Sequence, residues 1–355
     1  MTRDASGPLP VDTLGMWDLT AHLPEQVRDA ATAAAQVGGL PEGRTFSDIA
    51  VLGMGGSGIA GDVVVATAAA ELAMPAAVVK SYTLPTWVGP DTLVFAVSCS
   101  GNTEETVAAT TAAWERGAAV VTVSSGGRLV ELAEAHGGPV VAVPASIPQP
   151  RAAFGAMAVP PLVVLERLGL LLGAGRQIGL AVAQLARRRD QLVEPDSPAE
   201  AVARRIGRTF ALVHGGPGYG AVAAQRWKTQ INENAKAPAF SAAQPELCHN
   251  EVVGWGQHGD VTRQVITLVT LRQPGEHPQV ARRFDLIADI LLEVVAEVVP
   301  VWAEGDGALA QFFDLVLFGD FVSLHLAGQE GVDPGPVPIL IEIKDRLSET
   351  AQPTG

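Results

Sequence analysis

The chain has 355 residues, of which 48% are hydrophobic and 17% charged, and its formal net charge is -14. This composition is typical of a globular α/β protein with room for two domains, and it excludes a disordered chain. The negative charge opposes binding to nucleic acid or to an anionic membrane surface.

Two cysteines, Cys99 and Cys248, are too few for a disulfide scaffold, and the N-terminus lacks the pattern of an export signal. We therefore expect a cytoplasmic protein with reduced thiols. The most apolar run, 158–175, is broken by Glu166 and Arg167, so no membrane-spanning helix is expected.

Residues 1–44 are predicted to form a loose arm and then a helix over 18–37. Between residues 45 and 150, short β-branched runs alternate with alanine-rich stretches of helical length; the runs are DIAVLGM, AAVVKSY, TLVFAVS, AAVVTVS and PVVAVPA. This alternation predicts a first domain built on a parallel sheet with helices on both faces.

A linker with prolines at 144, 148 and 150 leads into a helical segment within 151–194, whose helix is expected over about 160–190. In 195–328, FALVHGGPGYGAVAAQ repeats the element order of DIAVLGMGGSGIAGDVV: an apolar strand, a glycine-rich turn and a helix. A second α/β domain is therefore predicted, with a strand in RQVITLVTLR and helices over 284–297 and 308–328. Residues 329–355 are expected to form a proline-rich turn and a short helix.

The first glycine-rich turn, GMGGSG at 53–58, follows an apolar strand and precedes a helix, so its backbone N–H groups can hold an anion. It matches a dinucleotide fingerprint, but it also fits a phosphate loop with Ser57 or a tight turn without ligand. A dinucleotide site for NAD needs an acidic residue about 20 positions on, where this chain has Lys80. That lysine opposes NAD and leaves NADP open.

A second loop, SCSGNTEET at 98–106, carries three hydroxyls on Ser98, Ser100 and Thr103. Such hydroxyls suit a compact dianion better than an extended dinucleotide. Alternatively, Ser100 or Thr103 caps the helix that begins near Glu104. The cluster favours a single phosphate group as the ligand.

Together, GMGGSGIAGD and SCSGNTEET resemble the phosphosugar-binding loops of the sugar isomerase (SIS) domain. Four further stretches, PQPRAAFG, NENAKAPAF, PELCHNEVVGW and IEIKDRL, are similar to the bifunctional phosphoglucose/phosphomannose isomerase family, from about residue 45 to the end. The resemblance implies two SIS-type αβα sandwich domains, each with a mainly parallel sheet. It also implies a small-molecule sugar phosphate substrate, with fructose 6-phosphate converted to glucose 6-phosphate, mannose 6-phosphate or both.

The resemblance also implies roles for individual residues. Arg151 lies near the reacting carbons, Glu233 moves the proton, and His249 and Lys344 open the sugar ring. In this family the histidine comes from the second subunit, so a homodimer with a shared site is implied, without a cofactor. The residues implied to hold the phosphate are Ser57, Ser98, Ser100 and Thr103, with the backbone of Gly55 and Gly56.

The chemistry is consistent with those roles, because aldose–ketose isomerisation needs a base and a positive group beside the enediolate. Residue type alone, however, leaves another explanation: Glu233 and Lys344 are then ordinary solvated helix residues, and Arg151 is a charge on a surface loop. His249 is equally a core histidine; on a strand, it and Cys248 would face opposite sides. No CxxC or HExxH pattern is present, so a metal-independent reaction is expected.

One departure from the family concerns the sugar epimers, whose joint tolerance is associated with a threonine shortly before the lysine. Residues 271–349 contain no threonine, so dual specificity stays open. A non-catalytic SIS-type protein that binds a phosphosugar for regulation is the main alternative. Two further alternatives are weaker. The isomerase domain of an amidotransferase would need a preceding glutaminase with a cysteine at position 2, where this chain has Thr2. An NADP-dependent dehydrogenase is the weakest alternative.

Overall fold

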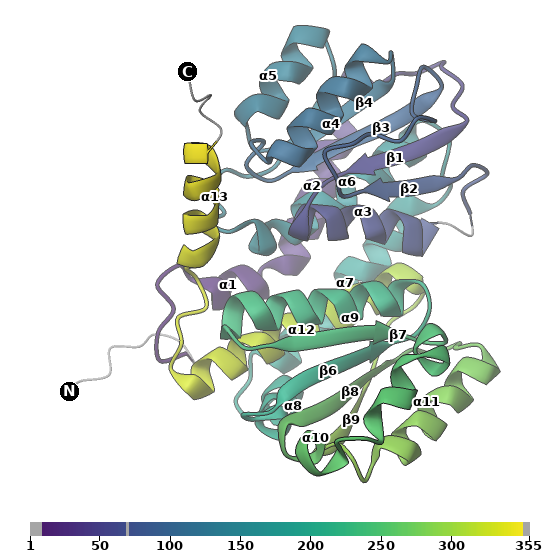
Figure 1. Ribbon diagram of the computed structural model, residues 1–355. Coiled ribbons are helices and arrows are strands. Elements are labelled where there is room, and N and C mark those ends of the chain that lie inside the picture. The colour runs from purple at the N-terminus through teal and green to yellow at the C-terminus, as the bar shows by residue number, and fades with distance from the viewer. Residues whose placement is uncertain (1–8, 69–70, 351–355) are drawn as a thin grey trace.

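The computed structural model describes residues 9–68 and 71–350, and it contains two parallel sheets stacked in one molecule (Figure 1). The first sheet has the strand order β2-β1-β3-β4-β5 and the second the order β7-β6-β8-β9. Every neighbouring pair of strands is parallel. The predicted α/β fold with two mainly parallel sheets is therefore confirmed.

The first half contains all five predicted strands. Its elements are α1 (Met16–Ala21), α2 (Leu23–Gln36), β1 (Asp48–Leu52), α3 (Gly55–Ala68), β2 (Ala76–Val79), β3 (Thr92–Ser98), α4 (Glu104–Glu115), β4 (Ala119–Ser124), α5 (Gly127–His136) and β5 (Val140–Ala142).

Two helices, α6 (Phe154–Arg167) and α7 (Ala174–Leu192), connect this half to the second. The elements that follow are α8 (Pro198–Ile206), β6 (Phe210–Gly215), α9 (Tyr219–Gln230), β7 (Ala239–Ala243), α10 (Gly259–Val265), β8 (Ile266–Arg272), α11 (Pro278–Leu291), β9 (Glu297–Trp302), α12 (Ala308–Glu330) and α13 (Pro338–Thr350).

The strands are apolar throughout because both faces of each sheet are covered. In β3, Phe95 belongs to the large core cluster that includes side chains of α2, α3 and α6, whereas Val94 packs with the side chains of α4 and α5. The large cluster continues into the second sheet through Val213 and Val269. The inner faces of the two sheets thus share one core, rather than two separate ones as domains of ordinary size would suggest.

Helix α12 supplies many side chains of this shared core and packs against α7, α8 and α9. In the part of the chain that the structure describes, it is the one helix long and apolar enough to cross a membrane, and 94% of its apolar window is buried inside the protein. A core helix of a soluble protein has the same properties, because a helix that is hydrophobic all round must be buried.

Two predicted helices have different bounds in the structure. The single helix expected over 18–37 is two helices that meet at His22, because Pro24 occupies the first turn of the second one. The helix expected over 160–190 is also two: α6 starts earlier, at Phe154, and two glycines with positive φ, Gly169 and Gly173, separate it from α7.

The predicted helix over 284–297 is wrong at both ends, since α11 spans Pro278–Leu291 and strand β9 begins at Glu297. Strand β9 was not predicted from the sequence, because its run EVVPVW contains Pro300. Proline removes a ladder hydrogen bond and is tolerated at a sheet edge. Strand β9 is the edge strand beside β8, which explains why the strand forms despite its proline.

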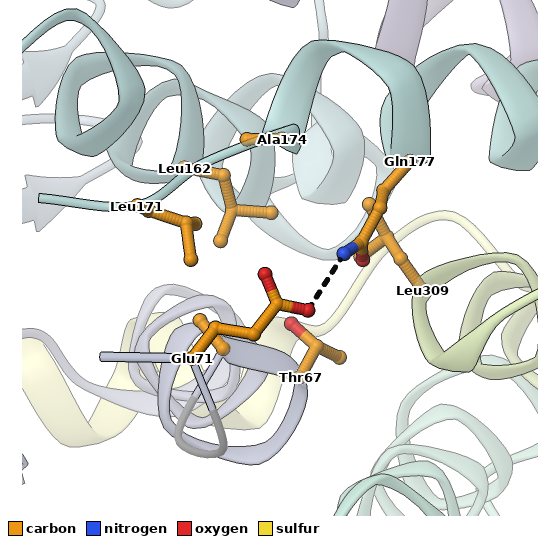
Figure 2. Close-up of a pocket in the computed structure, with 8 residues that line it drawn as sticks. Thr67, Glu71, Leu162, Leu171, Ala174, Gln177 and Leu309 are labelled. Atoms are coloured by element: carbon orange, nitrogen blue, oxygen red, sulfur yellow. Dashed lines mark hydrogen bonds between the residues drawn. The ribbon is translucent and has the colours of Figure 1, made fainter. Parts of the chain in front are cut away.

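A small cavity marks the seam between the two halves, where the C-terminal end of α3 meets α6, α7 and α12 (Figure 2). Its wall is mostly apolar, and Gln177 Nε2 donates a hydrogen bond to Glu71 Oε1 across it, at 3.0 Å. The cavity lies at the opposite end of α3 from Gly55, about 18 Å along the helix axis. It is therefore separate from the cleft described next.

Candidate active site

The largest group of predicted site residues lies at the carboxyl ends of β1 and β3. These strands are neighbours, and the chain leaves them for opposite sides of the sheet, so their loops diverge and leave a crevice. A cleft of about 1170 Å³, partly open to solvent, lies there. Nine of the ten predicted residues line it: Gly55, Gly56, Ser57, Ser98, Ser100, Thr103, Arg151, Glu233 and Lys344.

The loop after β1 turns sharply into α3. A side chain at Gly53 would approach the carbonyl oxygen of Ser57 to 2.9 Å, so the turn requires glycine there. Helix α3 begins at Gly55, which directs unpaired N–H groups of its first turn into the cleft. The buried Ser57 hydroxyl donates only to Met157 Sδ, at 3.2 Å. Because a thioether is a weak acceptor, that hydroxyl can turn to a stronger one.

The loop after β3 holds its hydroxyls by contacts within the loop. Ser98 Oγ lies 2.9 Å from Thr103 Oγ1 and accepts a hydrogen bond from the Gly101 N–H. Thr103 is the N-cap residue of α4, but its side chain makes no capping hydrogen bond. Capping therefore does not account for the Thr103 hydroxyl. Gly101 has φ 70°, and a side chain there would lie 1.7 Å from the Gly126 carbonyl oxygen.

Lys80, which kept the NADP hypothesis open, is engaged within the protein. Its Nζ lies 2.5 Å from Asp62 Oδ2. Burial raises the pKa of the Asp62 carboxyl, and the Lys80 ammonium opposes that shift. The lysine is thus a partner of α3, and its position offers no carboxylate to a ribose.

Arg151 lies in the short 3₁₀ turn Pro150–Ala153 and is only 3% exposed. Its Nη1 donates to Gln149 Oε1 at 3.0 Å and to Glu233 Oε2 at 3.4 Å. Its Nη2 donates to the carbonyl oxygens of Pro334 at 2.5 Å and Gly335 at 2.7 Å. Burial lowers the pKa of this guanidinium, and the charge of Glu233 opposes the shift. The alternative that Arg151 is merely a charge on a surface loop is therefore wrong: the residue is a buried hub that joins three segments of the chain.

A buried ion pair, which the sequence analysis missed, supports this hub. Arg226 donates two hydrogen bonds to Asp320, at 3.1 and 2.6 Å, and one to the Arg151 carbonyl oxygen at 3.1 Å. Its guanidinium also lies over the Phe154 ring, 4.0 Å from the centroid. Asp320 stands in a largely apolar run of α12, and a carboxylate in such a run is the signal in the sequence that predicts a buried partner.

Glu233 is not on a regular α-helix as predicted, but on the π-helical turn Ile231–Ala235 that ends α9. Such turns are rare and often found at functional sites. The turn directs Glu233 toward Arg151 and buries Asn234, whose Oδ1 accepts from Arg151 Nε at 2.7 Å. Asn234 Nδ2 donates to Ser323 Oγ at 2.9 Å. Asn234, the residue after Glu233, thus helps to fix the plane of the Arg151 guanidinium.

Lys344 lies on α13, which extends along one edge of the molecule beside the first half (Figure 1). The wall of the cleft beside it is apolar and consists of Val337, Leu340 and Ile341. The segment before the helix is tied to the N-terminal region, since the Thr13 hydroxyl donates to Asp333 Oδ2 at 2.6 Å. Lys344 therefore lines the cleft, and it lies on a helix whose side chains are mostly exposed.

His249 is the one predicted site residue that does not line the cleft. It is exposed, at the end of the 3₁₀ helix Glu246–His249. Cys248 and His249 are not on a strand, and Cys248 packs against the outer core cluster of the second sheet. Within the described ranges 9–68 and 71–350, no three His, Cys, Asp or Glu side chains gather as metal ligands would.

The corresponding crevice of the second sheet, between β6 and β8, differs from the first. The loop after β8 has no serine or threonine; it has Glu276, whose carboxylate accepts from Arg272 Nη2 at 2.9 Å and from the Gln273 N–H at 2.8 Å. Burial, and to a lesser extent the charge of Glu276, raises the pKa of Tyr219, at the start of α9, to about 12. The chain's own carboxylate occupies this loop, and residues 273–277 offer no side-chain hydroxyl to an anion.

Comparison with known proteins identifies the family of the chain and its structural relatives. The profile of the bacterial phospho-glucose isomerase C-terminal SIS domain matches residues 195–347. The chain is 33% identical to the bifunctional phosphoglucose/phosphomannose isomerase of Caldicellulosiruptor bescii, over 94% of this chain and 99% of that one. It is 35% identical to that of Aquifex aeolicus, over 86% of this chain and 92% of that one. The fold is similar to the C-terminal domain of glucosamine-fructose-6-phosphate aminotransferase from Francisella tularensis, with a TM-score of 0.68, 14% identity, and coverage of 90% and 98%.

Proposed function

Because the chain belongs to the bifunctional phosphoglucose/phosphomannose isomerase family, we propose that its cleft interconverts fructose 6-phosphate with glucose 6-phosphate, mannose 6-phosphate or both. The protein is a phosphosugar isomerase. One observation carries the proposal: a single cleft joins two hydroxyl-bearing loops to the buried Arg151 and its partly exposed partner Glu233.

The substrate phosphate binds at the first turns of α3 and α4 in this proposal. Ser57, Ser100 and Thr103 donate to its oxygens, and the helix N-termini add favourable partial positive charge. Ser98 is 1% exposed and engaged with Gly101 and Thr103. It therefore acts mainly by holding the loop in shape.

Glu233 is the base that takes a proton from C2 of the open-chain sugar and returns it to C1. The Nη1 of Arg151 faces this carboxylate at 3.4 Å, longer than its 3.0 Å contact with Gln149. Because the Glu233 contact is weak, Nη1 can donate to the oxygens of the enediolate as charge develops there. The other contacts of Arg151 hold the guanidinium in place, so little reorganisation is needed.

Ring opening requires an acid and a base near the ring oxygen, and Lys344 and the His249 of a partner subunit take these roles. His249 is exposed and outside its own cleft, which suits a residue donated to a second copy. Val253, four residues later, is 80% exposed, and Ile343 on α13 is 49% exposed. Apolar side chains beside both residues are consistent with a homodimer interface.

Epimer preference depends on the wall beside Lys344. Val337, Leu340 and Ile341 offer no hydroxyl to the sugar, so no side-chain donor of this segment favours either configuration at C2. The wall discriminates by shape alone, and apolar shape differences give only modest selectivity.

The competing proposal is a regulatory protein that binds a phosphosugar without converting it. Such a protein needs the phosphate loops but not a buried arginine aimed at a carboxylate. The test is to incubate the protein with fructose 6-phosphate and to quantify glucose 6-phosphate and mannose 6-phosphate separately. Formation of either aldose supports the isomerase; formation of neither, with tight binding of the substrate, supports the regulatory protein.

A further inference from the structure

Lys236 stands directly after the π-helical turn that carries Glu233, with the backbone in the left-handed region at φ 56°. Within the described ranges, only Asp196 shares a positive φ among non-glycine residues. Glycine and asparagine adopt this conformation most readily, and a lysine does so rarely. The backbone alone therefore does not explain a lysine at this position.

The ammonium of Lys236 bridges two segments. Its Nζ donates to the carbonyl oxygen of Glu233 at 2.5 Å and to that of Pro334 at 3.3 Å. The Pro334 carbonyl also accepts from Arg151 Nη2. Two cations thus hold one carbonyl group, at the point where the chain turns toward α13.

This arrangement brings positive charges together. Burial lowers the pKa of the Lys236 ammonium, and the charge of Arg151 lowers it further, while Asp333 and Glu233 act in the opposite direction. The two carbonyl contacts compensate, since carbonyl oxygens are the acceptors that an ammonium requires. A solvent-exposed lysine without a structural role would be expected to point away from the positive charge of Arg151.

We propose that Lys236 is a positioning residue that clamps the backbone of Glu233 to the segment bearing α13, so that base and Lys344 keep one spacing across the cleft. The inference rests on the proposed function for its kinetic consequence. Lys236 does not line the cleft; it acts through Glu233 and Pro334 rather than on the substrate.

The test compares Lys236→Asn, which suits the left-handed backbone but lacks the ammonium, with Lys236→Arg, which restores a cation. Lys228→Asn on α9 is the control for loss of one positive charge. We expect Lys236→Asn to lower kcat about 10- to 100-fold, since displacements of about 1 Å have effects of that order. Its KM should stay within about twofold, because the phosphate loops are untouched, and Lys236→Arg should recover most of kcat.

Amide hydrogen exchange of residues 338–347 supplies a second measurement that needs no activity. The clamp predicts faster exchange there in Lys236→Asn than in the wild type or in Lys228→Asn. Unchanged exchange overturns the clamp, and faster exchange with unchanged kcat overturns its role in positioning the base. If the wild type does not isomerise fructose 6-phosphate, the proposed function fails, and the exchange data still decide whether the clamp exists.

Discussion

Ser57→Ala isolates the contribution of one hydroxyl to phosphate binding. This hydroxyl donates only to Met157 Sδ, a weak acceptor, so its removal should cost little stability, at most about 1 kcal/mol. A hydrogen bond to a charged group contributes about 1.5–3 kcal/mol. Loss of that bond corresponds to a rise in KM of about 10- to 160-fold. Because the phosphate is bound equally before and during the reaction, kcat should change little.

The assay is steady-state isomerisation of fructose 6-phosphate, with inorganic phosphate as a competitive inhibitor. The inhibition constant should rise together with KM. Ser98→Ala is the matched control: its hydroxyl is built into the loop, so this variant, unlike Ser57→Ala, should lose about 1–3 kcal/mol of stability. If Ser57→Ala leaves both KM and phosphate inhibition unchanged, the phosphate binds elsewhere.

Three further predictions concern the structure around the cleft. Asp320→Ala should destabilise the protein by about 3–5 kcal/mol in urea unfolding, because Arg226 is left buried and unpaired, while the double variant Arg226→Met/Asp320→Leu should recover most of that loss; equal losses in both would contradict this. Gly101→Ala should cost at least about 2 kcal/mol and raise KM, since its side chain meets the Gly126 carbonyl; wild-type KM and melting temperature would refute the steric argument. Burial alone would raise the pKa of the Asp333 carboxyl, but its hydrogen bonds with Thr13 and the Gly335 N–H prevail and lower the pKa below 3.8. The stabilisation that the Asp333 carboxylate provides is therefore complete above pH 3.8 and is lost as the pH falls through the lowered pKa. In an acid titration, Asp333→Asn should lose stability less steeply than the wild type, and parallel curves would argue against this role of Asp333.

The sheets could be predicted because their strands are nearly continuous β-branched runs between helical stretches. β9 was missed because Pro300 argues against a strand, and only its place at the sheet edge permits it. The position of a strand in a sheet depends on contacts distant in sequence, which a local pattern does not contain. The same reason explains why the shared core of the two halves was not foreseen.

For the site, the two loops and their hydroxyls could be predicted from local sequence, because a strand, a glycine turn and a helix together favour an anion at the helix N-terminus. The roles of Arg151, Glu233, His249 and Lys344 came from family resemblance and stay predictions. Residue type did not reveal that Arg151 is buried, since most arginines are exposed. Its partners Asn234, Pro334 and Gly335 lie in distant segments, and only the folded chain brings them together.

The central claim is that Glu233 moves the proton during isomerisation. Glu233→Gln keeps the shape of the side chain and removes the base, so its kcat for fructose 6-phosphate should fall about 10²- to 10⁴-fold while inhibition by inorganic phosphate stays within about twofold of wild type. Turnover of Glu233→Gln at the wild-type rate, with phosphate binding intact, would contradict the account.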